Sequence, residues 1–574
     1  MTFDLKCYII ILYKYIYILR YRKMRKYTVG IDFGTLSGRA VLVDVKNGEE
    51  CASVVMDYPH AVIDSVLPSS GEVLPVNWAL EDPRDYTAVL EYLPPALCRE
   101  AGIAKEQIVG IGIDFTCCTV LPIKKDGTPL VSLPEFDKNK HAYVKLWKHH
   151  ASQKWADRMN EVAAERGETF VNYFGGKISS EWLFPKLLQT AHEAPEVIEA
   201  ADYYIEAGDW LNFLLTGEQK RGYLFASYKG EYLPGIGYPS DEYLAAVDPA
   251  LPALAKRLLD APIAQMGECV GYVTKEAAAR FGLAEGTAVA ASIPDAHVAA
   301  PAVGLTKPGD IYGIFGTSNC YFTLADKYRD VAGICGYVPD GLIPGYYGVE
   351  AGLCAVGDHF AWVVDNLATP ADHAEAEKLG IPVIQLLVRR AAEKRPGQTG
   401  LIALDWWNGN RNILVDGDLT GMLIGMTLRT DTADILRALI EATAFATKVI
   451  IDRMGECGIN ITSLIAAGGI ARKDAFTMQV YSDVLGIPIN VISSKQAPAL
   501  GSAIYAAVAA GEYADVFAAS DAMKSPIYSS YTPNAENAPV YNALYREYLT
   551  LHDYFGRGEN NVMKRLLKIS QGEI

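Results

Sequence analysis

Apolar positions along the chain form short β-branched runs that end at glycines, separated by longer stretches of helical character. Residues 27–50 (YTVGIDFGTLSGRAVLVDVKNGEE) predict a strand, a tight Gly-Thr turn, a second strand and an Asn-Gly turn. Residues 108–130 (IVGIGIDFTCCTVLPIKKDGTPL) repeat that pattern and end at Asp-Gly, whereas residues 143–199 are rich in Lys, Ala and Glu and predict mainly helix. Strands that alternate with helices in this way indicate an α/β fold.

The strand-turn-strand element of residues 29–43 occurs again in the second half of the chain. Residues 312–324 (YGIFGTSNCYFTL) echo VGIDFGTLSGRAVLV, and the two Gly-Thr turns lie 282 residues apart. Residues 435–510 alternate helices and short strands, and they close with a helix of small residues suited to close packing beside a ligand. An internal duplication of this kind predicts two related halves.

A chain of 574 residues is too long for one hydrophobic core, so we expect two domains, 27–297 and 298–556. Residues 557–574 are expected to form a polar tail. The first 26 residues are strongly basic and share no pattern with the body, and we expect an extension outside the fold, with the functional start at Met24. A signal peptide is the alternative, but Lys14 interrupts the apolar run and no small-residue cleavage site follows.

The net charge limits the classes of binding partner to be expected, and the cysteines indicate the cellular compartment. The formal net charge is −16 and the only basic run lies at the extreme N-terminus, which argues against nucleic-acid and membrane partners and for small molecules. The ten cysteines are scattered without CxxC pairs or zinc spacing. Such cysteines are typical of reduced thiols, so we expect a cytoplasmic protein.

The two Gly-Thr turns are the first candidates for phosphate binding, since no P-loop motif and no complete dinucleotide fingerprint occurs. Gly34 and Gly316 would let backbone amides approach phosphate oxygens where a Cβ would collide. Arg39 could add a charged donor, and Asp32 could hold hydrated Mg²⁺. One such turn is weak evidence, because many hairpins contain one, but two in equivalent places of a duplicated chain are much stronger.

Two further segments carry candidate chemistry. Gly468 and Gly469 follow a strand and precede an amphipathic helix, a shape that accommodates a purine or ribose but also occurs in plain strand-to-helix turns. Asp295, in ASIPDAHVAAPAVG, either caps the following helix or acts as a base that faces a cleft. Its place between the two duplicated halves favours the base.

Taken together, the segments GIDFGT with Arg39, GKISSEW, PDAH, FGTS, AGGIARKD and ALGSA resemble the FGGY carbohydrate kinases. The resemblance covers residues 27–554, nearly the whole chain. It implies an α/β protein of two actin-like (RNase H-like) domains with the active site in the cleft between them, and it implies ATP and Mg²⁺ as cofactors. It is also compatible with a homodimer.

The resemblance further implies roles for individual residues. Asp295 would be the catalytic base and Asp32 the magnesium-binding residue. The residues implied in ATP binding are Gly34, Thr35, Arg39, Gly316, Thr317, Gly468, Gly469 and Lys473. The residues implied in sugar binding are Cys117 (through its backbone), Lys229, Asp295 and Glu350.

The implied reaction is phosphorylation of a ketopentose, with L-ribulose expected from the segments LPEFDKNKHAYVKLWKHH, GLIPGYYGVEAG and ALDWWNGNR. The segment around Lys229, ASYKGEYLPGIGYPS, departs from the family pattern, which keeps kinases for xylulose, ribitol or another polyol as alternatives. An actin-like ATPase or chaperone is the alternative of another class. Such proteins lack a base and a sugar-binding lysine between their halves.

Overall fold

The computed structural model describes residues 25–334 and 336–572, which divide into two compact units. Unit 1 comprises the described residues up to Val171, then Lys177–Thr306 and Gln496–Ser525. Unit 2 comprises Asn172–Gly176, Lys307–Lys495 and the described residues from Pro526 onward. The expected extension lies, except for residues 25 and 26, outside the described residues. The division differs from the expected domains chiefly because Gln496–Ser525 belongs to unit 1.

The main sheet of unit 1 is mixed, with the strand order β3-β2-β1-β5-β12-β11 and with β13 also paired to β5. Its strands are β1 (Tyr27–Phe33), β2 (Ser37–Asp44), β3 (Glu50–Asp57), β5 (Ile108–Phe115), β11 (Cys269–Tyr272), β12 (Ala288–Ala290) and β13 (Ile293–Pro294). The strands β1, β2 and β3 are antiparallel, whereas β1, β5, β12 and β13 run parallel. The strands predicted in this half are confirmed as β1 and β2 and as β5 and β6 (Val120–Ile123), although β6 belongs to a second sheet.

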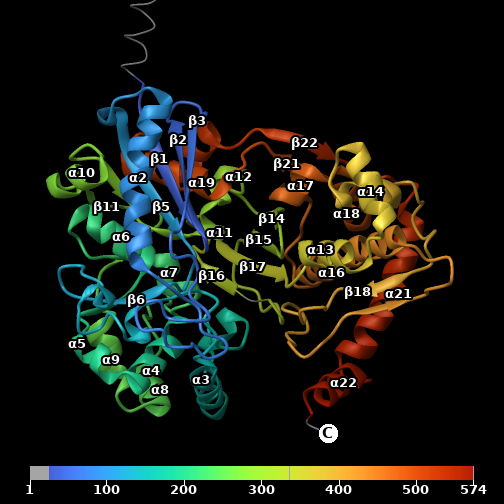
Figure 1. Cartoon of the computed structure of the whole chain (residues 1–574), viewed down its shortest axis with the longest axis horizontal. Coiled ribbons are helices and arrows are strands. Elements are labelled where there is room, and N and C mark those ends of the chain that lie inside the picture. Colours follow the sequence, from blue (N-terminus) through green and yellow to red (C-terminus); the bar gives the residue numbers. More distant parts are fainter. Residues whose placement is uncertain (1–24, 335, 573–574) are drawn as a thin grey trace, which may run out of the picture. The chain divides into compact units, whose positions relative to one another are not determined.

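Two helices cover this sheet. Helix α2 (Pro83–Ala101) packs on β2 and β3, and α19 (Ala497–Ala509) packs on β1 and β5. In Figure 1 the red α19 lies among the blue strands of unit 1 although it comes late in the chain. Along β1, Val29, Ile31 and Phe33 are fully buried, and the Phe33 ring contacts Tyr86 of α2.

Glycines on the opposite face of the strands explain why α19 joins unit 1. A Cβ on Gly30 would lie 1.7 Å from the Ala499 carbonyl oxygen, and one on Gly112 would lie 2.2 Å from the Ser502 carbonyl oxygen. Only bare backbone allows the helix to come so close. The small-residue helix that the sequence placed beside a ligand is thus packed against a sheet.

The remaining elements of unit 1 form smaller layers. A second sheet has the order β4-β7-β6-β8, and β9 pairs with β10. These strands are β4 (Leu80–Glu81), β6 (Val120–Ile123), β7 (Val144–Lys145), β8 (Tyr203–Glu206), β9 (Arg221–Gly222) and β10 (Ile263–Ala264). The helices are α3 (Gln153–Arg166), α4 (Leu183–Glu193), α5 (Pro195–Ala200), α6 (Ala207–Thr216), α7 (Tyr223–Tyr228), α8 (Asp241–Val247), α9 (Leu251–Leu258), α10 (Lys275–Phe281), α11 (Asp295–Val298), α12 (Ala300–Val303) and α20 (Val516–Met523).

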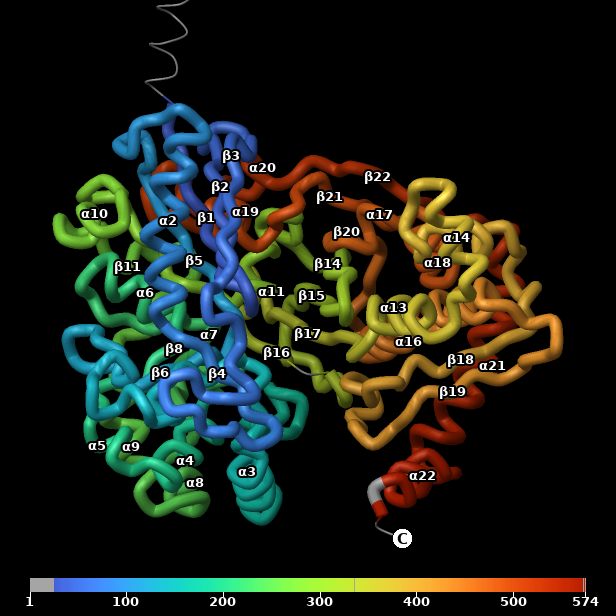
Figure 2. Tube along the Cα trace, viewed as in Figure 1, coloured from blue at the N-terminus to red at the C-terminus, as the bar shows by residue number. Residues whose placement is uncertain are grey.

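The main sheet of unit 2 repeats that of unit 1, with the order β16-β17-β15-β14-β20-β21-β22. Its strands are β14 (Asp310–Phe315), β15 (Asn319–Ala325), β16 (Gly336–Pro339), β17 (Tyr347–Leu353), β20 (Ser463–Ala467), β21 (Ile489–Ile492) and β22 (Ile527–Tyr531). An antiparallel β14-β15-β17 meander leads into parallel β14, β20 and β21 and an antiparallel edge strand, as β1-β2-β3 leads into β5, β12 and β11. Figure 2 shows the same strands along the chain, from yellow-green β14 to red β22. The predicted duplication is confirmed.

Helices of unit 2 enclose a core around the long α16. They are α13 (Gly357–Leu367), α14 (Pro370–Leu379), α15 (Val383–Ala392), α16 (Thr432–Glu456), α17 (Gly469–Lys473), α18 (Ala475–Leu485), α21 (Ala538–Gly556) and α22 (Val562–Gln571), with β18 (Ile402–Leu404) paired to β19 (Met422–Ile424). The segment expected to be a polar tail contains α22, whose Met563 is buried in this core. The polar-tail prediction gave too little weight to the apolar residues Val562, Met563, Leu566, Leu567 and Ile569, whose spacing is that of an amphipathic helix.

Candidate active site

Three carboxylates lie at one edge of the main sheet of unit 1. In the parallel register Asp32 of β1 is opposite Asp114 of β5, and Ile293 of β13 is also opposite Asp114. Asp295 follows β13 directly. Because parallel strands end at the same edge of a sheet, Asp32, Asp114 and Asp295 meet there.

Asp32 has one strong electrostatic neighbour on the adjacent strand. Arg39 is its partner in the antiparallel register, and Arg39 Nη1 lies 3.4 Å from Asp32 Oδ2. The Asp32 side chain is buried, and this burial raises its pKa even though the Arg39 guanidinium acts in the opposite direction. A buried carboxylate of this kind is suited to bind a cation.

Asp114 is a carboxylate at this sheet edge that the sequence analysis did not single out. It is fully buried, and its Oδ2 accepts a hydrogen bond of 2.6 Å from the Ser502 hydroxyl of α19. Its Oδ1 has no hydrogen-bond partner among the described residues. Burial and the neighbouring Asp32 raise the pKa of Asp114 well above its usual range. The tetrapeptide GIDF, present at both 30–33 and 112–115, was the available signal.

Asp295 is the first residue of α11, and its Oδ1 accepts a 2.7 Å hydrogen bond from the Ala296 backbone N–H. Two residues later, the buried His297 ring lies 4.1 Å from the Tyr228 ring, centroid to centroid. Tyr228 ends α7 immediately before Lys229, whose ammonium lies 5.5 Å from the centre of the Trp182 ring. The predicted base and the predicted sugar-binding lysine therefore lie on adjacent elements.

The loop after β5 completes this group. Cys118 has a positive φ of 61°, so the chain turns sharply at Cys117. The fully buried Lys186 donates hydrogen bonds to the carbonyl oxygens of Cys118, at 2.6 Å, and Leu146, at 2.8 Å. Burial raises the pKa of the Cys117 thiol, while the Lys229 ammonium acts to lower it. The structure thus brings Cys117, Lys229 and Asp295 together, and it adds Lys186 as the residue that fixes the loop backbone.

The first Gly-Thr turn keeps open space above its backbone. The Gly34 N–H donates to the Ser37 carbonyl at 3.1 Å, and a Cβ on Gly34 would find no atom nearer than 3.5 Å. The Thr35 hydroxyl accepts a 3.0 Å hydrogen bond from the Trp147 indole. The turn therefore has room for an anion beside Asp32 and Arg39.

Unit 2 carries the second group of predicted residues. Gly316 and the exposed Thr317 join β14 to β15, and the carbonyl oxygens of both accept hydrogen bonds from the start of α13. Gly468 has a φ of 99°, and a Cβ there would lie 2.4 Å from the Phe315 carbonyl oxygen, so this glycine lies against the end of β14.

The other predicted residues of unit 2 are arranged around this strand end. Nothing lies within 4 Å of where a Cβ on Gly469 would be, and Lys473, exposed, ends α17. Glu350 lies within β17, opposite Phe322 of β15, and is 9% exposed. The Gly-Thr turn and the double-glycine turn therefore meet at one strand end, and Glu350 lies farther inside the same sheet.

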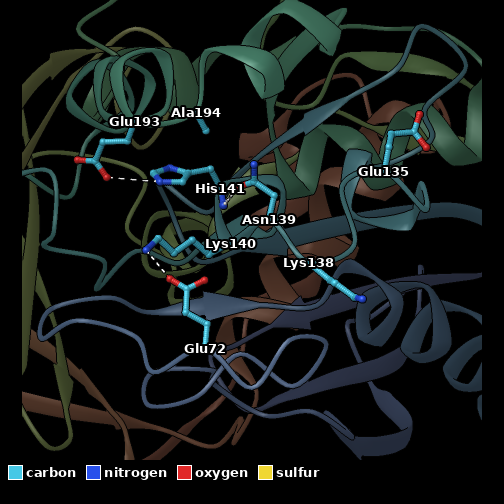
Figure 3. Close-up of a pocket in the computed structure, with 8 residues that line it drawn as sticks. All are labelled: Glu72, Glu135, Lys138, Asn139, Lys140, His141, Glu193 and Ala194. Atoms are coloured by element: carbon cyan, nitrogen blue, oxygen red, sulfur yellow. Dashed lines mark hydrogen bonds and ion pairs between the residues drawn. The ribbon is translucent and has the colours of Figure 1, made fainter.

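A polar hollow of about 490 Å³ on unit 1 contains none of the predicted site residues. Figure 3 shows its lining, in which Lys140 pairs with Glu72 at 2.7 Å and His141 lies 3.4 Å from Glu193. Burial, with the nearby Lys145 and Lys140 ammonium groups, lowers the pKa of His141 to about 2, so this ring stays neutral. The one charge pair described here, Lys140 with Glu72, is of a kind common on solvated surfaces.

Among the described residues, no cluster of three or more His, Cys, Asp or Glu side chains could hold a metal ion. A metal bound here would depend on one or two carboxylates together with water and substrate oxygens, which is how Mg²⁺ is usually held. In the part of the chain that the structure covers, no helix is both long and apolar enough to cross a membrane.

Comparison with known proteins shows which family the chain belongs to. Residues 27–302 match the N-terminal domain, and residues 311–510 the C-terminal domain, of the FGGY family of carbohydrate kinases. The chain belongs to this family, which confirms the resemblance read from the motifs and the two-domain actin-like fold.

Individual relatives are similar over nearly their whole length. The ribulokinase of Geobacillus thermodenitrificans is 49% identical over 94% of this chain and 97% of that protein. The ribulokinase of Mycolicibacterium smegmatis is 45% identical over 95% of this chain and 96% of its own length. Among solved structures, a xylulose kinase from Rhodospirillum rubrum superimposes with a TM-score of 0.74 at 23% identity, covering 92% of this chain and 98% of that one. The last likeness supports the fold alone.

Proposed function

We propose that this chain transfers the γ-phosphoryl group of ATP to L-ribulose, giving L-ribulose 5-phosphate for the catabolism of L-arabinose. The observation that carries the proposal is the near full-length match to ribulokinases at 45–49% identity. The gathering of Asp295, Lys229 and the Cys117 loop at one sheet edge supports it, because a pentulose needs a base and several polar contacts.

In the proposed reaction, Asp295 accepts the proton of the sugar's terminal hydroxyl. The oxygen then forms a bond to the γ-phosphorus as the bond to the leaving ADP oxygen breaks. The Cys117 backbone, Lys229 and Glu350 would bind the sugar. This positioning supplies much of the acceleration, and a well-placed base adds roughly 10²–10⁴-fold.

The nucleotide would be bound by backbone amides and a few side chains. The open space above Gly34, Gly316 and Gly469 fits phosphate oxygens or a ribose, since no side chain fills it. Thr35, Arg39, Thr317, Gly468 and Lys473 are assigned to the same ligand.

The buried Asp32 carboxylate fits hydrated Mg²⁺. Asp114 Oδ1, which has no hydrogen-bond partner among the described residues, is a further oxygen at this edge that can accept a hydrogen bond. When bound, the ion would neutralise phosphate charge. We assign the protein to the cytoplasm on its scattered free thiols, eight of which are described.

A panel of sugars tests the proposal. ADP release in a coupled assay should be fastest with L-ribulose, measured as kcat/KM against D-ribulose, xylulose, ribitol and a blank without sugar. A preference for xylulose or ribitol would change the proposed substrate and leave the proposed reaction class, phosphorylation of a sugar or polyol, unchanged. ATP hydrolysis that no sugar accelerates would instead favour an actin-like ATPase and overturn the proposal.

A further inference from the structure

Asp32 has two neighbours on the adjacent strands, the basic Arg39 and the acidic Asp114, and they differ in how far they are buried. Arg39 approaches Asp32 Oδ2 at 3.4 Å, but the Arg39 side chain is 40% exposed. The Asp32 side chain is only 6% exposed, so this ion pair is partly buried and only its Arg39 end reaches solvent. Asp114, opposite Asp32 in the parallel register, is completely buried. Asp32 thus lies between a partly exposed guanidinium, which it contacts, and a fully buried carboxyl group on the adjacent parallel strand.

The position of Asp114 is set by a helix that comes from far along the chain. The Ser502 hydroxyl, itself 2% exposed, donates to Asp114 Oδ2 at 2.6 Å across a separation of 388 residues. Helix α19 lies directly against the strand at this point, because the Ser502 carbonyl oxygen lies only 2.2 Å from where a Cβ on Gly112 would be. Two strands and one helix thus fix one oxygen of Asp114 and leave Oδ1 without a partner among the described residues.

We propose that Asp114, fixed by Ser502, is a positioning residue that keeps the Asp32 carboxylate oriented toward hydrated magnesium and prevents it from closing onto Arg39. The proposal rests on the function proposed above. Groups that orient a metal-binding side chain commonly matter almost as much as that side chain, because a rotated carboxylate presents the wrong lone pairs. Neither Asp114 nor Ser502 is assigned any contact with sugar or ATP.

The test uses the full chain and four substitutions. In Asp114→Ala only Arg39 remains beside the Asp32 carboxylate, so half-saturation by Mg²⁺ should require about tenfold more ion, or beyond that, as for other orienting residues. Ser502→Ala should raise the Mg²⁺ concentration at half-saturation about threefold, which is the effect of one lost hydrogen bond. Asp114→Asn, which can still accept from Ser502 and donate to Asp32, should recover most of the loss. Ser520→Ala is the matched control, since this buried serine donates one 2.7 Å hydrogen bond to the Pro301 carbonyl in the same unit.

The main readout is binding of Mn²⁺ to the protein with ADP, followed by electron paramagnetic resonance without any sugar. This measurement stays informative even if the sugar panel overturns L-ribulose, so the two proposals fail separately. Weaker Mn²⁺ binding in Asp114→Ala and Ser502→Ala, with recovery in Asp114→Asn, supports positioning. Equal losses in Asp114→Asn and Asp114→Ala would show that the charge of Asp114 matters, and would overturn it. Unchanged Mn²⁺ binding with a lowered melting temperature would leave Asp114 a purely structural residue and also overturn it.

Discussion

Replacing Asp295 by Asn separates the catalytic role of this residue from a capping role. Asp295 begins α11, and its Oδ1 accepts a hydrogen bond of 2.7 Å from the Ala296 N–H. An Asn side chain keeps an oxygen at the same position, so this contact survives the substitution. What Asn loses is the ability to accept a proton at neutral pH.

The two roles predict effects of different size on different observables. Loss of a positioned base should lower turnover by at least about 10²-fold. That factor corresponds to about 2.7 kcal/mol in the activation free energy. The N-cap of this four-residue helix is Pro294 and Asp295 is its first residue, so the hydrogen bond from the Ala296 N–H contributes about 1 kcal/mol to stability at most. Asp295→Asn should thus be nearly inactive with an unchanged melting temperature, because the Asn side-chain oxygen can accept the same hydrogen bond from the Ala296 N–H.

Turnover, the dissociation constant of ATP and the melting temperature should be measured for Asp295→Asn and for Asp295→Ala. If Asp295 is the base, both variants lose turnover and both still bind ATP. If it is only a cap, Asn is silent and Ala loses about 1 kcal/mol of stability with turnover preserved. A fully active Asp295→Asn enzyme would refute the mechanism proposed here.

Two further substitutions address sugar binding and packing. Glu350→Ala should raise the KM for the sugar about tenfold or more, because a sugar hydroxyl loses a charged acceptor, while the KM for ATP changes little; an equal loss of ATP affinity would place Glu350 at the nucleotide. Gly30→Ala introduces a Cβ 1.7 Å from the Ala499 carbonyl oxygen and should cost about 1–3 kcal/mol or more of unfolding free energy in chemical denaturation. Gly455→Ala, at a helical position with nothing within 4 Å, should be neutral or slightly stabilising, and equal effects at the two glycines would contradict the packing argument.

The duplication could be predicted from sequence because it depends on local order. Each half has an apolar strand, a Gly-Thr turn and a second apolar strand, and these features are contiguous in the chain. The structure repeats them as β1-β2 and β14-β15, with matching antiparallel registers. Asp32 and Asp295 were identifiable for the same reason, since each directly follows or ends an apolar run.

Residues whose role depends on distant pairing could not be found in this way. Asp114 becomes a partner of Asp32 only through the parallel register of β1 and β5, and of Ser502 only through α19. Lys186 looks like an ordinary residue of an amphipathic helix, yet it is fully buried and holds the Cys118 carbonyl. A lysine gives no sign in the sequence of which backbone oxygens it will reach.

The assignment of α19 to unit 1 shows how one feature can serve both the fold and the site. Glycines at positions 30, 110 and 112 have no side chains that would keep a helix away from the sheet. The facing helix α19 also carries small residues, namely Ala, Gly and Ser. Once α19 lies that close, the hydroxyl of Ser502 reaches the end of β5 and fixes Asp114. The close packing and the orientation of the carboxylates therefore have one cause, and a change that lifts α19 from the sheet should disturb both stability and the binding of magnesium.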